Sequence, residues 1–328
     1  MNGRTILLLA CAGLMATGLR AAAQEAGTEA SRQLQNLVYY PHRGDWRATG
    51  EFTGSLDDSG NTVNDLGTQT SARSTSYQKA LLGLSYGLTD GLRLGVTETE
   101  LFSQHTQVTN QLTGVTTTED ANGYSDPTVT IAQRMHDSSD EGFYADAVLS
   151  ATPALGHALS ATGAQTGNDV AGAWNTTASV PLYYRHGLSG FANEVGLVPS
   201  LSRSYGGLSS GQTPNTSTLT SPCWYGAVLI EDRFHFNRSW FVEPGVSINI
   251  PYSYETASQS LGATDTQQQV DLNASPSLTV GFLPVDWIML SASVTYIDRG
   301  TDTYPAAGTG SSVDSQQTYG TVAMQLVF

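Results

Sequence analysis

The feature that most constrains this chain is an alternation of apolar and polar residues that recurs from residue 45 to the carboxyl terminus. In one stretch Leu92, Leu94 and Val96 alternate with polar or small residues. Successive side chains of a strand point to opposite faces, so this pattern predicts strands with one apolar face. The chain is therefore predicted to be all-β. Twelve stretches fit the pattern: Trp46–Thr53, Lys79–Tyr86, Leu92–Thr97, Asp126–Met135, Phe143–Ala154, Trp174–Arg185, Gly190–Ser204, Trp224–Phe234, Trp240–Tyr252, Gln269–Phe282, Trp287–Tyr296 and Tyr319–Phe328.

The connections between these stretches alternate between short and long. The five short turns are Gly87–Gly91, His136–Gly142, His186–Ser189, His235–Ser239 and Leu283–Asp286. The six long connections are Asp57–Arg73, Gln104–Ser125, Leu155–Ala173, Tyr205–Pro222, Glu255–Gln268 and Asp298–Gln316. This alternation is typical of a transmembrane antiparallel up-and-down β-barrel with short periplasmic turns and long extracellular loops. A β-sandwich would mix its turn lengths at both ends, and a β-solenoid would show a fixed repeat, which this sequence lacks. We therefore predict a twelve-stranded barrel over residues 45–328.

The amino terminus has the pattern of a secretory signal peptide. Arg4 supplies a positive charge, Thr5–Gly18 is apolar or small, and Ala21–Ala23 offers a small-residue cleavage site. Residues 1–23 are therefore predicted to be a signal peptide. The following segment, residues 24–44, has no periodicity, and it either hangs in the periplasm or folds back as a plug. From the sequence we favour a loosely ordered leader.

The carboxyl terminus is a strand that ends on an aromatic residue. Val322, Met324, Leu326 and Phe328 share one face of it. This ending resembles the closing strand of bacterial outer-membrane barrels, whose terminal Phe is recognised by the assembly machinery. The resemblance implies that Phe328 is an assembly signal and that the barrel assembly machinery is a partner.

Composition supports a β-rich secreted protein or a membrane barrel over a cytosolic enzyme. Charged residues make up only 13% of the chain, against about 25% in ordinary soluble domains. Removal of the signal peptide leaves Cys223 as the single cysteine, which excludes an intramolecular disulfide. Loss of Arg4 and Arg20 would take the formal net charge from −15 to −17, which argues against nucleic acid or an anionic membrane surface as a partner. The expected location is the outer membrane of a Gram-negative bacterium, with its lipid as a partner.

One hairpin carries a resemblance to a known family. The run Tyr86–Val96 reads Y-G-L-T-D-G-L-R-L-G-V and is similar to the first hairpin of the family called "MetA-pathway of phenol degradation". The segment Gly123–Pro127 resembles that family's G-x-G-D motif, although Ser125 replaces the usual Gly. Ala151–Ala154 is similar to its P-T-G strand end, again without the Gly. The resemblance covers residues 37–328. It implies an outer-membrane barrel associated with uptake of aromatic or other small hydrophobic compounds, with no catalytic residues to transfer.

The sequence offers no pattern of catalytic or metal chemistry. No two of its six histidines lie within five residues of each other, whereas metal ligands are normally grouped at short spacing. No serine is placed by sequence to pair with His105 or His157, as a lipid-acting Ser-His barrel enzyme would require. We therefore predict neither enzymatic activity nor a metal or other cofactor.

Nine charged residues share the parity of the inward, polar faces and lie near the predicted periplasmic turns. A charge inside a barrel is tolerated where it meets water or an opposite charge. Such a belt is either a plug of ion pairs or a selectivity constriction, and the sequence favours neither. The members of this charge belt are Arg47, Arg93, Arg134, Asp146, Arg185, Glu194, Glu231, Arg233 and Glu243.

Together these patterns predict an outer-membrane channel or transporter through which small molecules, aromatic or hydrophobic compounds among them, pass passively. Two alternatives from other classes remain. One is a structural or adhesive barrel with a closed lumen, and the other is a lipid-acting barrel enzyme.

Overall fold

The computed structural model describes residues 39–138, 141–155, 173–186, 193–210, 217–237, 239–258, 265–285, 287–305 and 310–328, together with Leu34 and Leu37. The segment predicted to be a signal peptide lies outside these ranges. No helix among the described residues is long and apolar enough to cross a membrane. The strands are β1 (Trp46–Asn64), β2 (Gln69–Thr89), β3 (Leu92–Asn110), β4 (Thr116–Tyr124), β5 (Thr128–His136), β6 (Gly142–Thr152), β7 (Ala173–Ser179), β8 (Leu182–His186), β9 (Asn193–Ser210), β10 (Ser217–Thr220), β11 (Cys223–His235), β12 (Trp240–Asn249), β13 (Tyr252–Ser258), β14 (Thr266–Val270), β15 (Asn273–Val285), β16 (Ile288–Pro305) and β17 (Ser311–Val327).

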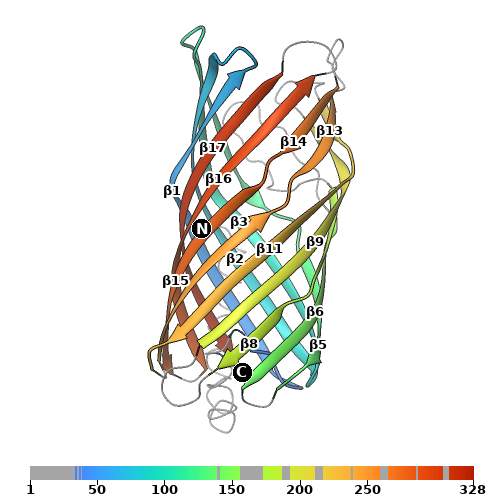
Figure 1. The fold of residues 1–328 in the computed structure, drawn as a ribbon, viewed down its shortest axis with the longest axis vertical. Helices are drawn as coiled ribbons and strands as arrows, with labels where there is room; N and C mark the ends of the chain where they lie inside the picture. The colour runs from blue at the N-terminus through green and yellow to red at the C-terminus, as the bar shows by residue number, and fades with distance from the viewer. Residues whose placement is uncertain are drawn as a thin grey trace, which may run out of the picture.

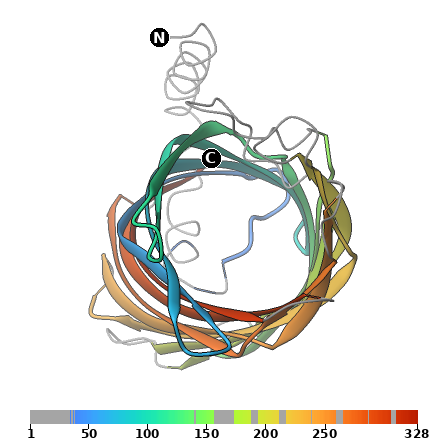
Figure 2. The same cartoon turned by 90° about the horizontal axis from the view of Figure 1, so that it is seen from above.

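These segments form one closed antiparallel barrel (Figure 1 and Figure 2). Five of its twelve long strands are each split into two segments, namely β4 and β5, β7 and β8, β10 and β11, β12 and β13, and β14 and β15. The barrel closes where β1 pairs with β17, from Arg47 opposite Val327 to Asn64 opposite Ser311. The predicted twelve-stranded antiparallel barrel is confirmed.

The strands extend beyond the predicted ends on the side away from the short turns. β1 continues to Asn64 and β2 begins at Gln69, so most of the predicted loop Asp57–Arg73 is strand. The predicted loop Asp298–Gln316 likewise contains the ends of β16 and β17. These loop boundaries were wrong because Ser, Thr, Asn and Asp occupy both faces there. Strand that projects past the apolar band meets water on both faces, and the alternation that marks a membrane strand is lost.

The two faces of the strands differ as the alternation predicts. On β16, Leu290 and Val294 are 39% and 48% exposed on the outer wall. Their neighbours Ser291 and Ser293 line a cavity inside the barrel. An outer wall with apolar side chains exposed all round is suited to lipid rather than to water.

The face assignment predicts opposite effects of adjacent substitutions. Leu290→Arg places a charge on the outer wall and is expected to destabilise the folded barrel by ~2–4 kcal/mol if the site lies near the bilayer midplane. Ser291→Arg points into the aqueous lumen and is expected to be mild. Urea unfolding from lipid vesicles measures both, and equal losses would mean that the faces are wrongly assigned.

Candidate functional site in the barrel lumen

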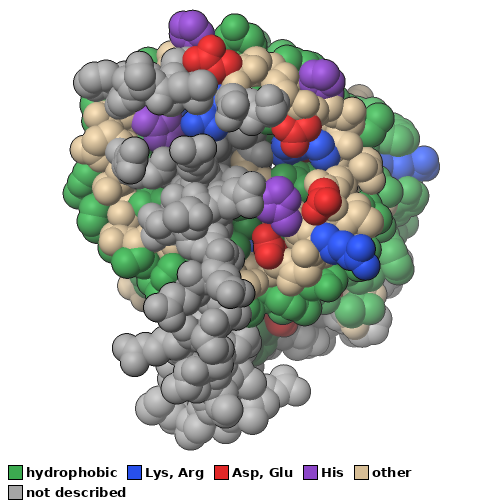
Figure 3. All heavy atoms as spheres, turned by 90° about the horizontal axis from the view of Figure 1, so that it is seen from below, with side chains coloured by type: hydrophobic (Ala, Val, Ile, Leu, Met, Phe, Trp, Pro, Cys, Tyr) green, Lys and Arg blue, Asp and Glu red, His purple; other side chains and the backbone are tan. Residues whose placement is uncertain are grey.

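The nine residues of the charge belt lie at the end of the barrel where the short turns are. They come from β1, β3, β5, β6, β8, β9, β11 and β12, so the belt runs around much of the lumen. Seen from this end, acidic, basic and histidine side chains surround the mouth (Figure 3). Asp146, Glu194 and Arg233 are buried even though the lumen is polar. The belt is therefore packed rather than freely hydrated.

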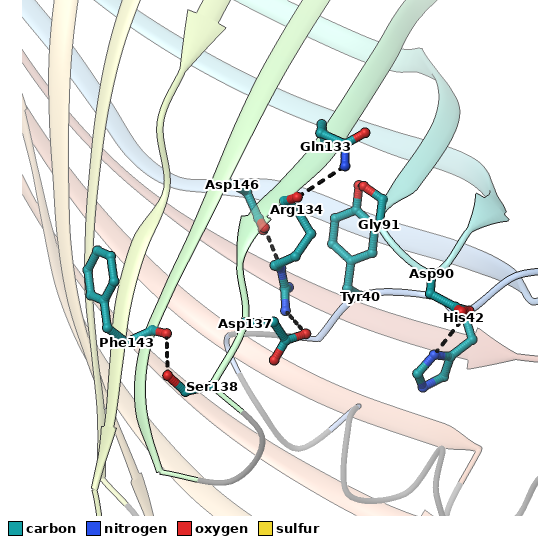
Figure 4. Close-up of polar contacts among 10 residues, drawn as sticks. All are labelled: Tyr40, His42, Asp90, Gly91, Gln133, Arg134, Asp137, Ser138, Phe143 and Asp146. Carbon is teal, nitrogen blue, oxygen red and sulfur yellow. Dashed lines mark hydrogen bonds and ion pairs between the residues drawn. The ribbon is translucent and has the colours of Figure 1, made fainter.

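Opposite charges in the belt pair mainly across neighbouring strands. Arg134 on β5 donates from Nε to Asp146 Oδ1 on β6 at 2.5 Å, and from Nη1 to Asp137 at 3.2 Å (Figure 4). Arg233 on β11 pairs with Glu243 on β12. These ion pairs neutralise charges that would be energetically costly to leave unpaired where the side chains are buried.

Glu194 connects the belt to the amino-terminal leader. Its side chain is fully buried, at 0% exposure. Arg185 Nε lies 3.5 Å from Oε1, and His235 Nε2 lies 3.4 Å from Oε2. The backbone N–H of Leu37, in the amino-terminal leader, donates to the same Oε2 at 2.8 Å. One carboxylate thus joins three strands to the leader.

The described part of the leader lies inside the mouth of the barrel, and Tyr40 is its main anchor. The Tyr40 hydroxyl donates to the backbone carbonyl of Gly91 at 3.2 Å (Figure 4). It also donates to the backbone carbonyl of Ala132. Burial raises the pKa of Tyr40, so the hydroxyl stays protonated and able to donate at neutral pH. The guanidinium carbons of Arg93 and Arg134 lie 5.1 and 4.8 Å from the centroid of its ring. These are cation–π distances, so the leader contacts the belt directly.

The leader rests on the Y-G-L-T-D-G hairpin that suggested the family resemblance. A Cβ at Gly87 would lie 1.9 Å from the carbonyl oxygen of His42, so only glycine permits this approach. Gly44 N donates to Gly87 O at 2.9 Å. Arg43 N donates to the Asp90 carboxylate at 3.2 Å. Gly87 and Asp90 of the hairpin therefore hold the leader against the barrel wall.

Apolar residues of the leader fill a second part of the mouth. Leu34 and Tyr39 are buried at 2% and 7% exposure. Arg47 lies over the Tyr39 ring at 5.4 Å from its centroid. The Phe241 ring packs against the wall at Gly281, where an added Cβ would lie only 1.9 Å from the ring's Cζ. Leader and wall together form one buried apolar cluster, whose members are Leu34, Tyr39, Phe241, Leu283, Met289 and Val327.

Next to the belt, the lumen holds a cavity of about 540 Å³. Its wall is mostly hydroxyl and amide, with Arg233 and Glu243 of the belt at one end and Glu51 and Lys79 as further charges. Thr53 and Thr321 hydrogen-bond each other at 2.9 Å across the β1–β17 seam. The cavity is suited to polar rather than to purely apolar contents. Its remaining polar lining comes from Tyr77, Thr99, Thr279, Ser291, Ser293, Thr295, Gln317, Tyr319 and Gln325.

The histidines do not form a site with serine or with a metal in the part of the chain that the structure describes. His105 Nδ1 lies 2.6 Å from Asp120 Oδ1, and its other ring nitrogen contacts the Gln107 amide at 3.2 Å. No serine hydroxyl bonds to this ring within the described ranges, and no cluster of metal ligands occurs there. His157 lies outside them.

Phe328 contributes its backbone to barrel closure. Trp46 N donates to Phe328 O at 2.7 Å, and Phe328 N donates to Trp46 O at 2.9 Å. Its recognition by assembly machinery stays a prediction.

Sequence reasoning placed the belt but missed the groups that contact it from the leader. Tyr39 and Tyr40 lie in a segment without periodicity, so parity could not place them. The only available signal was their position just before the first strand. Glu51, by contrast, could have been predicted as a lumen residue from the sequence. It lies on the same face of the first strand as Arg47.

The chain matches no family model and no curated protein. The resemblance to the phenol-degradation family therefore stays a prediction. Among solved structures, the chain is similar to an outer membrane channel from Pseudomonas putida F1, with 13% identity and a TM-score of 0.56 over 88% of this chain and 97% of that one. It is also similar to the transport unit of the autotransporter AIDA-I from Escherichia coli, with 12% identity and a TM-score of 0.50 over 92% and 98%. At these identities the likeness concerns the fold alone: the chain has the fold of an outer-membrane β-barrel.

Proposed function

We propose that the protein is an outer-membrane channel through which small polar solutes pass passively. The observation that carries the proposal is the polar cavity of about 540 Å³ inside a closed barrel whose outer wall is apolar. A barrel that served only as a scaffold could fill its interior with packed side chains. A hydroxyl- and amide-lined space instead offers hydrogen bonds to a solute in transit.

The same lining bears on the class of solute. A bare hydrocarbon would displace water from hydroxyl and amide groups without replacing their hydrogen bonds, and each lost partner is unfavourable. Aromatic compounds that carry hydroxyl or carboxylate groups would meet partners along the wall. We therefore propose polar solutes, aromatic or not, and no catalytic role for the lumen.

In this proposal the narrow step is at the belt, where the leader lies. Tyr40 lies over Arg93 and Arg134 and is bonded to two wall carbonyls. A solute that crosses this end of the barrel would pass these groups, so the fixed charges that it meets there would set the selectivity of the channel. The belt would combine both roles expected of it: paired ions that hold the wall, and charges that face the pathway.

Arg93 is the member best suited to test the pathway. It has no carboxylate within 4.0 Å among the described residues, so its loss leaves no buried acid unpaired. Arg93→Gln is expected to shift ion preference toward cations because fixed positive charge leaves the pathway. Reversal potentials across planar bilayers under a salt gradient measure the shift. Arg203→Gln, which makes the same charge change on the outer wall, is the control.

A lumen that never conducts would contradict the proposal and favour a structural or adhesive barrel. Conduction with an unchanged reversal potential in Arg93→Gln would retain the channel but remove the belt from its selectivity.

A further inference from the structure

Arg203 differs from the other cations of the barrel in the face that it occupies. Among the Lys and Arg residues in the described strands, it alone has the parity of the outer wall. On β9 it follows Val195, Leu197 and Leu201, which are 44%, 41% and 52% exposed on that wall. The intervening Ser202 points inward and bonds Thr177 at 2.8 Å. Arg203 therefore sits at the outer end of an apolar stripe.

Aromatic rings hold the guanidinium in this place. Its carbon lies 5.1 Å from the Trp224 ring centroid and 4.8 Å from that of Tyr205. Trp224 is the direct cross-strand partner of Arg203 on β11. Trp224, Tyr205 and, on neighbouring β7, Trp174 are 55%, 47% and 52% exposed. Aromatic residues of this kind mark the level where the apolar core of a membrane meets its headgroups.

The guanidinium is held but not neutralised. Arg203 has no carboxylate within 4.0 Å among the described residues, and its Nε is buried without a hydrogen-bond partner. Outward carboxylates do occur, as at Glu98 on β3 and at Asp232 on neighbouring β11, but Asp232 lies opposite Val195, at the other end of the apolar stripe from Arg203. Leaving a buried donor of a charged group without a hydrogen bond is energetically costly. A ligand with anionic oxygens at this depth would neutralise the charge of the guanidinium.

We propose that Arg203, with Trp224 and Tyr205, binds the phosphate of a lipid headgroup in the outer leaflet. The planar guanidinium offers two parallel N–H donors that match phosphate oxygens, while the rings fix its orientation and contact the first carbons of the lipid chains. This inference rests on the proposed membrane placement and is independent of conduction through the lumen.

The test compares lipid retention by the folded barrel in vesicles of phosphatidylcholine containing bisphosphorylated lipid A. Native mass spectrometry after detergent release counts lipid A adducts. Arg203→Gln is expected to weaken the tightest adduct by about tenfold or more, since a charge-assisted hydrogen bond is lost. Arg203→Lys should retain part of the binding, because a point charge still attracts phosphate. Arg299→Gln, on the lumen face of β16, should bind as wild type does.

Wild-type retention in Arg203→Gln would overturn the inference, as would an equal loss in Arg299→Gln. Competition by millimolar inorganic phosphate would also overturn it, because the site would then take the free anion rather than a lipid. If Arg203→Gln fails to fold, Arg203→Lys and Trp224→Phe decide the matter by whether both lower lipid A retention. Single-channel conductance of Arg203→Gln should equal that of wild type, so failure here and failure of the channel proposal remain distinguishable.

Discussion

Glu194→Gln is expected to destabilise the folded barrel by ~3–5 kcal/mol, because breaking a buried ion pair from one side leaves the other charge without a partner. Glu194 has 0% exposure, and Arg185 and His235 both lie against its carboxylate. The amide keeps the volume and one acceptor for Leu37 N–H, so the charge is the main loss. Urea unfolding from lipid vesicles measures the change.

The matched control is Glu255→Gln. Glu255 is exposed at the far end of the barrel on β13, and the same chemical change there should leave stability within about 0.5 kcal/mol of wild type. If both variants lost the same stability, the buried pairing at Glu194 would not be the reason, and the belt would be a solvated rim.

Tyr40→Ala is expected to raise single-channel conductance several-fold. The substitution removes the ring that lies over Arg93 and Arg134 and the hydroxyl that bonds the carbonyls of Gly91 and Ala132. Both effects free the mouth of the barrel. Recordings in planar bilayers measure it, and Tyr304→Ala, an exposed tyrosine at the other end, is the control.

Tyr40→Phe separates the two contributions. It keeps the ring over the arginines but loses the hydrogen bonds to the wall, so an intermediate conductance is expected. A Tyr40→Ala barrel with wild-type conductance would mean that the leader does not limit the pathway.

The sequence predicted the strands of the barrel correctly where lipid requires one apolar face. Where that requirement ends, the predicted strand ends were wrong. Around Leu290 one face meets apolar surroundings and the other a polar cavity, so period two is clear. Beyond Leu56 on β1 both faces carry mostly small polar residues, and the strand to Asn64 has the composition of a loop. The limit is physical, because hydrogen-bonded pairing alone imposes no hydrophobic pattern.

In the belt too, contacts between residues close in sequence could be predicted, and contacts between distant residues could not. Parity placed its nine residues on the inward face, and their nearness to the predicted short turns placed them at one end of the barrel. The pair of Arg134 with Asp146 joins strands linked by a short turn, so their proximity follows from sequence distance. The bond from Leu37 to Glu194 spans 157 positions, and no local pattern carries it.

The most direct test of the channel is solute flux through proteoliposomes, followed by swelling in a small neutral sugar. Ser293 lines the cavity, and its neighbour Val294 is 48% exposed on the outer wall. Ser293→Trp should fill part of the pathway and slow swelling several-fold relative to wild type, whereas Val294→Trp should leave the rate unchanged. Swelling of wild-type vesicles no faster than protein-free ones, or equal rates in the two tryptophan variants, would contradict passage through the lumen.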